Sequence, residues 1–130
     1  MSDETKGRSR IAINPENKPY WEAAGKGKLL IKKCNACNEV HFYPRSICPH
    51  CFSTDTAFIE ASGRGVIYSY SVTRQGKPPY VIAYVTLDEG ISMLTNIVDF
   101  DIDKVRIGQA VKVKFVAADD GYAVPMFAPA

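Results

Sequence analysis

The sequence lacks the features that would assign it to several large classes of protein. None of its 130 residues belongs to an apolar run near the ~20 residues that span a bilayer. Residues 1–10 are polar and do not contain the apolar core of a secretory signal. The hydrophobic fraction of 46% is ordinary for a globular chain, which excludes global disorder. We therefore expect a soluble, cytoplasmic protein with one ordinary domain, or with a very small module attached to one.

The motifs of common catalytic sites are also missing. The chain contains no Walker loop, no Gly-x-Ser-x-Gly, no Gly-x-Gly-x-x-Gly and no His-Glu-x-x-His. Its two histidines, His41 and His50, both lie in or beside a cysteine-rich segment, so the rest of the chain has no base of the usual kind at neutral pH. We expect no catalytic residue here, and the chain on its own is not predicted to be an enzyme.

Net charge is small, at +2, and composition alone does not indicate a nucleic-acid-binding protein. The charge is unevenly distributed, because residues 1–52 hold nine Lys/Arg and five Asp/Glu, whereas the other 78 hold seven and nine. A basic patch of this kind fits a solvated face, and it also fits a contact to phosphate groups. Its members are Lys18, Lys26, Lys28, Lys32, Lys33 and Arg45.

Four cysteines lie within 18 residues, at Cys34, Cys37, Cys48 and Cys51. In a chain without an export signal they are expected to be reduced thiols. Each Cys-x-x-Cys pair can form a tight turn whose two sulfurs point to one centre, and two such turns place four thiolates around a tetrahedral ion. Such a site favours one structural Zn²⁺ per chain, with rubredoxin-type iron as the alternative. A four-thiolate sphere is closed, which argues against catalytic zinc, and both histidines are expected on the surface.

The remaining sequence predicts a short helix followed by β-strands. Residues 1–13 are expected to be a flexible lead-in, and a helix is predicted over 18–24, with Asn17 as its N-cap and Gly25 as its stop. An apolar strand at 29–31 leads to the cysteines. Further strands are predicted at 66–73, 80–87, 91–98, 111–115 and 122–127, separated by a loop at 76–79, a charged connection with a possible helical turn at 99–107 and a turn at 119–121.

These five C-terminal strands fit a small closed barrel of the OB type best, because closure removes exposed edges. An open five-stranded sandwich also fits the periodicity. On the first of these strands, Val66, Tyr68, Tyr70 and Val72 alternate with polar residues and predict one half-buried face. Its two tyrosines, together with Tyr80 and Tyr84, are expected mainly in the core, with partner contact as the alternative.

Several segments together resemble a family of zinc-ribbon/OB-fold proteins associated with acyl-CoA enzymes. They are Pro19-Tyr20-Trp21, the run from Leu29 to Cys37, the run from Tyr43 to Cys51, Gly63 to Tyr70, Pro79 to Ala83 and Ile107 to Val113. The similarity covers about residues 15–130. Asn38 stands where the family usually has glycine after the second cysteine, and asparagine tolerates the left-handed backbone that such a position requires.

The resemblance implies a mainly β fold with a short N-terminal helix, a rubredoxin-like zinc ribbon and then a five-stranded OB-fold barrel. Its expected divisions are a lead-in at 1–13, a helix and ribbon at 14–58 and a barrel at 59–130. It also implies a non-catalytic subunit in a hetero-oligomer with a thiolase-like, or alternatively hydratase-like, catalytic subunit. The associated chemistry is carbon–carbon bond cleavage or acyl transfer on CoA thioesters, with the thioester bound mainly by the partner and no membrane involved.

Two groups of residues are candidate contacts within such a complex. Lys32, Lys33 and Arg45 are the cations nearest the cysteines in sequence, and we consider them for CoA phosphate contact. The uncharged tail from Tyr122 to Ala130 is the candidate partner interface, with Tyr122, Met126 and Phe127 as its contacts. The tail fits equally well as a closing barrel strand.

Two other functions fit the same elements. OB barrels and zinc ribbons both occur in proteins that bind single-stranded nucleic acid, but the net charge of −2 over residues 53–130 disfavours that function. A rubredoxin-like electron carrier is the third possibility, and it would require iron in place of zinc.

Overall fold

The chain forms one short helix and eight strands within the residues that the computed structural model describes, namely 12–75, 78–118 and 121–130. Most of the lead-in 1–13, part of the loop 76–79 and residues 119–120 of the predicted turn lie outside these ranges. Within them, no helix is long and apolar enough to cross a membrane. The elements are α2 (Lys18–Ala24), β1 (Leu30–Cys34), β2 (Val40–His41), β3 (Thr56–Glu60), β4 (Arg64–Thr73), β5 (Tyr80–Leu87), β6 (Ser92–Ile97), β7 (Ala110–Ala117) and β8 (Ala123–Pro129).

The helix α2 confirms the helix predicted at residues 18–24. Pro19 lies in its first turn, where a missing N–H removes no helical hydrogen bond. Asn17 occupies the N-cap position, but its side chain makes no capping bond to the helix. Its Oδ1 instead accepts the Asn14 backbone N–H at 2.9 Å, and Asn14 Oδ1 accepts the Asn17 N–H at 2.9 Å. The Asn17 side chain therefore holds the turn before the helix.

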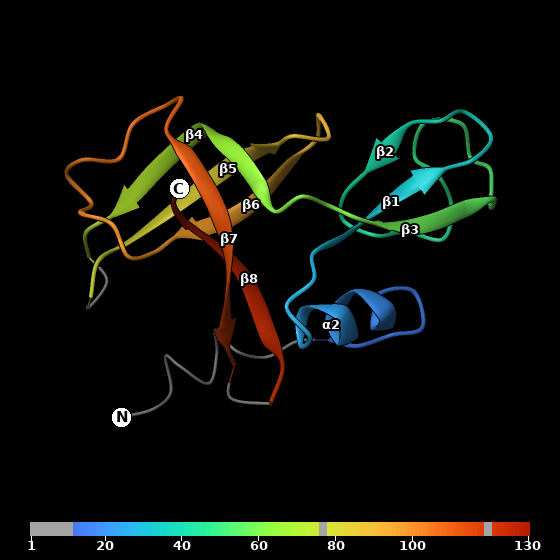
Figure 1. Cartoon of the computed structure of the whole chain (residues 1–130), viewed down its shortest axis with the longest axis horizontal. Helices are drawn as coiled ribbons and strands as arrows, with labels where there is room; N and C mark the ends of the chain where they lie inside the picture. Colours follow the sequence, from blue (N-terminus) through green and yellow to red (C-terminus); the bar gives the residue numbers. More distant parts are fainter. Residues whose placement is uncertain (1–11, 76–77, 119–120) are drawn as a thin grey trace.

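A three-stranded antiparallel sheet in the order β2-β1-β3 carries the cysteine turns. Its third strand, β3, was not predicted from the sequence. Tyr20 of α2 packs edge-on against Phe42 and Tyr43, which follow β2, and joins the same buried cluster as Leu29 and Ile31. Figure 1 shows α2 beside β8 of the barrel, and α2 contacts both β8 and β1. The helix thus packs against both parts of the chain.

The other five strands close into a barrel in the order β4-β5-β6-β8-β7, which confirms the predicted mainly β fold and excludes the open sandwich. All neighbouring pairs are antiparallel except β6 and β8, which run parallel. The interior contains Ile67, Val81, Val85 and Val111, each at most 2% exposed. Gly65 permits the closest backbone approach, because a Cβ there would lie 2.4 Å from the Thr86 carbonyl oxygen.

A bulge in β4 overturns the predicted face of that strand. Opposite β5, Ile67 pairs with Val85 and Ser69 with Tyr84, so Tyr68 is the extra residue. Such a residue reverses which positions of the strand face inward. The buried residue is therefore Ile67 and not Val66 or Tyr68, which are 44% and 67% exposed.

The four strand tyrosines that we expected mainly in the core are instead exposed. Tyr68 lies at the bulge, and the others are between 39% and 47% exposed; they are Tyr70, Tyr80 and Tyr84. On β5, Tyr84 alternates with the buried Ala83 and Val85, so the strand's pleat turns its ring outward. The prediction of core burial was wrong because apolar composition does not distinguish the two faces of a strand.

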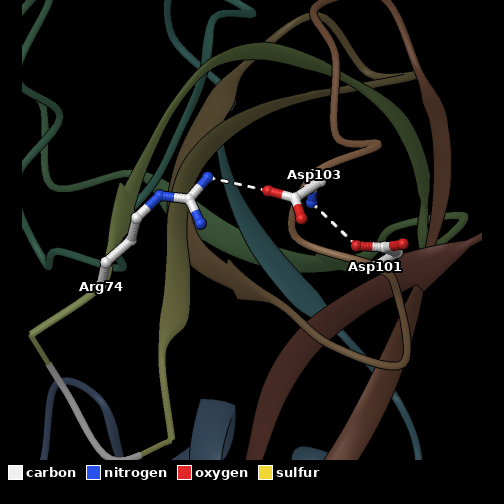
Figure 2. Close-up of polar contacts among 3 residues, drawn as sticks. All are labelled: Arg74, Asp101 and Asp103. Carbon is white, nitrogen blue, oxygen red and sulfur yellow. Dashed lines mark hydrogen bonds and ion pairs between the residues drawn. The ribbon is translucent and has the colours of Figure 1, made fainter.

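The charged connection at 99–107 forms turns, and no helix is assigned within it. The Lys104 N–H donates to the Asp101 carbonyl at 2.9 Å, and the Asp101 carboxylate accepts the Asp103 N–H at 2.9 Å. Figure 2 shows how the Asp103 carboxylate then meets the guanidinium of Arg74, just after β4, at 2.9 Å. Val105 from the same connection is buried in the core. The connection is therefore fixed across the barrel end by a buried valine and by an exposed ion pair.

The C-terminal tail is the closing barrel strand, the second of the two structures considered for it. β8 pairs with β7 from Ala117↔Ala123 to Val111↔Pro129. Phe127 is fully buried, so its side chain is not available for the predicted partner contact. Tyr122 and Met126 are half-buried, and their partner contacts stay a prediction. The tail therefore completes the barrel and buries Phe127 in the core.

Replacing Phe127 with alanine should destabilise the chain by about 3–5 kcal/mol, because the substitution leaves a cavity in a closed core. Met126→Ala is the matched control, since Met126 pairs with the exposed Lys114 on the outer side of the barrel. Urea denaturation of both variants measures the difference. Equal losses of unfolding free energy in the two variants would contradict this assignment of the inner face.

Candidate metal centre

The four cysteines lie on two turns that share one backbone pattern. In the first turn, the Asn38 N–H donates to the Cys34 carbonyl at 2.8 Å, and the Cys34 N–H donates to the Glu39 carbonyl at 2.9 Å. In the second, the Phe52 N–H donates to the Cys48 carbonyl and the Cys48 N–H to the Ser53 carbonyl, each at 2.9 Å. The sequence therefore builds the same turn twice, and both turns present their cysteines to a common centre.

Each turn requires one residue with left-handed backbone. Asn38 has φ of 64° and Phe52 has φ of 65°, each one residue after the second cysteine of its pair. Asparagine adopts this conformation readily, as predicted, whereas it is rare for a bulky residue such as phenylalanine. The Phe52 ring is 76% exposed, so no packing of that side chain compensates. The second turn therefore keeps its backbone hydrogen bonds even though phenylalanine disfavours the positive φ that the turn imposes on Phe52.

The four sulfur atoms have the spacing of a tetrahedral metal site. All lie within 4.8 Å of one another, with Cys34 Sγ 3.6 Å from Cys51 Sγ and Cys37 Sγ 3.7 Å from Cys48 Sγ. Four thiolates bound to zinc at about 2.3 Å would lie about 3.8 Å apart. Among the residues that the structure describes, these four cysteines form the single His/Cys/Asp/Glu cluster suited to a metal. Their arrangement and chemistry fit Zn²⁺.

Backbone N–H groups and crowding divide the four thiols into two kinds. The Cys37 N–H lowers the pKa of Cys34 to about 7. At Cys37, the Glu39 N–H acts in the same direction, but burial and the neighbouring thiols outweigh it and raise the pKa to about 12. At Cys48, burial opposes ionisation, but nearby N–H groups outweigh it and lower the pKa. At Cys51, the Ser53 N–H favours ionisation, but the Cys34 thiol and burial outweigh it and raise the pKa. Full ionisation at this spacing needs a cation to offset the mutual repulsion.

Neither histidine belongs to the sulfur cluster. His50 is exposed, as expected, but His41 on β2 is only 5% exposed, which corrects the prediction that both lie on the surface. Burial lowers the pKa of His41. Both histidines line an open cleft of about 630 Å³ between the cysteine turns and the β5–β6 turn, where Glu89 lies.

The three candidate phosphate-contacting cations do not share a face. Lys32 is only 8% exposed, and its Nζ donates to Thr56 Oγ1 at 3.2 Å and lies 4.3 Å from the centre of the Phe58 ring. Lys33 follows it on β1 and therefore points to the opposite face of the sheet. Arg45 is exposed in the loop after β2. Lys32 is thus engaged with β3 and is little exposed for the phosphate contact predicted for it.

Glu16 is a contact of the metal module that the sequence did not indicate. Its carboxylate accepts the backbone N–H of Ser46, in the loop before Cys48, and this bond lowers the pKa of Glu16, with smaller contributions from Arg45 and Lys32. The bond ties the segment before α2 to the second cysteine turn. No motif predicts it, because it joins residues that are 30 positions apart.

Two protein-family models match this chain in succession. One describes the rubredoxin-like zinc ribbon domain of ChsH2 and matches residues 21–57, and the other describes the C-terminal OB-fold domain of ChsH2 and matches residues 58–116. The family resemblance inferred from the sequence motifs is therefore confirmed.

Curated relatives carry names of three kinds. A DUF35 domain-containing scaffold protein of Methanothermobacter thermautotrophicus is 41% identical over 67% of this chain and 71% of its own length. A probable enoyl-CoA hydratase alpha subunit of Thermomonospora curvata is 40% identical over 95% of this chain, which spans 40% of that relative's length. The benzoylsuccinyl-CoA thiolase subunit BbsA of Geobacter metallireducens is 28% identical over 62% of this chain and 57% of its own.

A solved structure described as the Ltp2-ChsH2(DUF35) aldolase contains a chain similar to this one. It is 39% identical, with a TM-score of 0.82, and the match covers 92% of this chain and 98% of that one. Together with the family models, it supports the assignment of the four-cysteine module as a zinc ribbon.

Replacing Cys48 with serine should abolish stoichiometric metal binding and unfold the β2-β1-β3 sheet, because a module this small depends on its metal for folding energy. The barrel should persist, since its core lies in other strands. His50→Ala is the matched control and should keep about one zinc per chain. Elemental analysis with near- and far-UV circular dichroism measures both effects. Freshly purified, reduced wild-type protein without metal would contradict the prediction.

Proposed function

This chain belongs to the DUF35 family, in which a ChsH2-type zinc ribbon precedes a ChsH2-type OB-fold domain, and we propose that it is a non-catalytic zinc-binding subunit of an acyl-CoA-processing complex. The observation that carries the proposal is the pairing of a closed four-thiol centre with an OB barrel in one chain. Relatives similar to this chain are named as scaffolds and as subunits of CoA enzymes.

The placement of titratable groups supports a non-catalytic role. The chain contains two histidines, and both lie against the ribbon, His41 buried and His50 beside Cys48. Nucleophilic catalysis needs a nucleophile held against a base, and among the described residues the thiols are gathered in the metal cluster instead. Four ligands would complete a zinc coordination sphere and leave no position for substrate.

Zinc supplies structure in this proposal. Cys34, Cys37, Cys48 and Cys51 would hold one ion per chain and join the two turns that the three-stranded sheet presents. Reduced thiols of this kind belong in a reducing compartment, so we place the protein in the cytoplasm. Four thiolates would also accept iron, and the identity of the bound metal separates the subunit role from electron transfer.

The partner in the proposal is a thiolase-like catalytic subunit that carries out carbon–carbon bond cleavage or acyl transfer on a CoA thioester. The thiolase-subunit and aldolase relatives support this choice, and the hydratase-subunit relative supports a hydratase-like partner as the alternative. The thioester would be bound mainly by that partner. Lys33 and Arg45 stay candidates for contact with CoA phosphates from this chain.

The purified chain should not cleave any acyl-CoA by itself, whereas adding the thiolase-like subunit of the same organism should produce or raise thiolytic activity. The expectation follows because no nucleophile–base pair is found in residues 12–75, 78–118 and 121–130. Release or consumption of free CoA measures the rate, and the Cys48→Ser variant should lose the stimulation because its ribbon is unfolded. Thiolysis by the chain alone, or no binding to any acyl-CoA catalytic subunit of that organism, would contradict the proposal.

A further inference from the structure

The outer side of β4, β5 and β6 carries large apolar side chains in solvent. Val66, Tyr68, Tyr84 and Leu94 are 44%, 67%, 47% and 56% exposed. They form one surface, because Val66 pairs with Thr86, Thr86 with Ser92, and Tyr84 with Leu94. The Thr86 and Ser92 hydroxyls also bond each other at 2.8 Å. We call this surface the neutral face, and its members are Val66, Tyr68, Tyr84, Thr86, Ser92 and Leu94.

β4 begins with the exposed Arg64, and beyond that residue the strands that carry the neutral face are uncharged. No Asp, Glu, Lys or Arg occurs in residues 65–73, 80–87 or 92–97. The outer side of β7 is different, because Lys112 and Lys114 are both exposed there. Aromatic side chains with few neighbouring charges, interleaved with hydroxyl groups, are typical of the buried centre of a protein–protein interface. A solitary domain gains nothing from exposing such a surface.

The same surface of an OB barrel commonly binds ligands in other proteins, including single-stranded nucleic acid. Stacking on Tyr68 and Tyr84 would fit bases, but a nucleic acid also brings a row of phosphates that need Lys or Arg. Strands β4, β5 and β6 supply a single cation, Arg64, at the edge of the face, which is too few for a row of phosphates. A largely uncharged protein surface matches the face better.

The size of the face distinguishes a larger partner from a second copy. Three strands spaced by about 4.8 Å, over about six residues each, offer a footprint of about 300 Å². Two convex barrels meeting on this face would bury far less than the roughly 1,200–2,000 Å² of a stable association. Ser92 also lines the cleft beside the cysteine turns, so a larger protein on the face can extend its contact to the zinc ribbon.

We propose that the neutral face is where the catalytic subunit docks, an inference that rests on the proposed function. Tyr84 and Leu94 lie at its centre as a cross-strand pair and serve as the main contacts. The contact is made by side chains, because the strands on which it lies are already paired within the closed barrel.

The test compares Leu94→Arg with the matched variant Ala117→Arg, which adds the same charge at an exposed position of β7. Binding to the thiolase-like subunit of the same organism is measured by calorimetry, after circular dichroism and zinc content show that each variant is folded. Leu94→Arg should weaken binding by at least about tenfold. Ala117→Arg should change it by no more than about twofold. Tyr84→Ala is a second, milder variant, and it should also weaken binding if Leu94→Arg fails to fold.

Each alternative outcome overturns the inference in a recognisable way. If the wild-type chain binds the catalytic subunit and the Leu94 and Tyr84 variants bind equally well, the docking surface is elsewhere and the proposed function stands. If the wild-type chain binds no acyl-CoA catalytic subunit, the proposed function fails as well. Tight binding of oligodeoxythymidine that is lost in Tyr84→Ala would assign the face to nucleic acid. A wild-type dimer in sedimentation that Leu94→Arg abolishes would assign it to a second copy.

Discussion

Four sulfur atoms within 4.8 Å of one another require the rest of the ribbon to hold two cysteine turns against a single centre. At that spacing the thiols cannot all ionise unless a cation offsets their repulsion, and the pKa values of Cys34 and Cys37 accordingly move apart, to about 7 and about 12. The backbone meets this requirement with two equivalent turns, even though this places Phe52 at a positive φ with its ring in solvent. The three-stranded sheet, the Glu16–Ser46 bond and the aromatic packing of α2 then hold those turns in position.

Features that depend on local spacing could be predicted from the sequence. The Cys-x-x-Cys pairs, the helix 18–24 and the strand 80–87 each follow from a pattern within a few residues, and the structure agrees with all three. The strand β3 carried no such signal, because all but its last residue are half-buried and its pattern does not alternate. It exists because β1 offers a free edge on that side, and that is a property of the assembled sheet.

Two errors share one physical cause, which is that position along a strand does not determine the face of a side chain until the pairing is known. The bulge at Tyr68 shifts the inward positions of β4, so an apparently regular alternation predicts the wrong face. Lys32 and Lys33 looked like one basic patch, yet neighbours on a strand point to opposite sides. Pairing with β3 then places the Lys32 ammonium over the Phe58 ring, where it donates a hydrogen bond to the Thr56 hydroxyl. The count of lysines along this segment therefore overstates the positive charge on any one face of the sheet that a phosphate could contact.

The tail, which is uncharged, and strands β4–β6, which are uncharged beyond Arg64, have similar composition but opposite roles, and barrel closure explains the difference. β8 joins β7 along its length and meets β6 at Ile97↔Phe127, so the inward Phe127 is used to complete the core. Once the barrel is closed, no strand of it offers a free edge for a partner to extend, and recognition has to use outward side chains. Those of β7 include lysines that favour water, whereas Tyr84 and Leu94 on β5 and β6 do not. Closure by the tail is therefore what makes the neutral face the surface best suited to a partner.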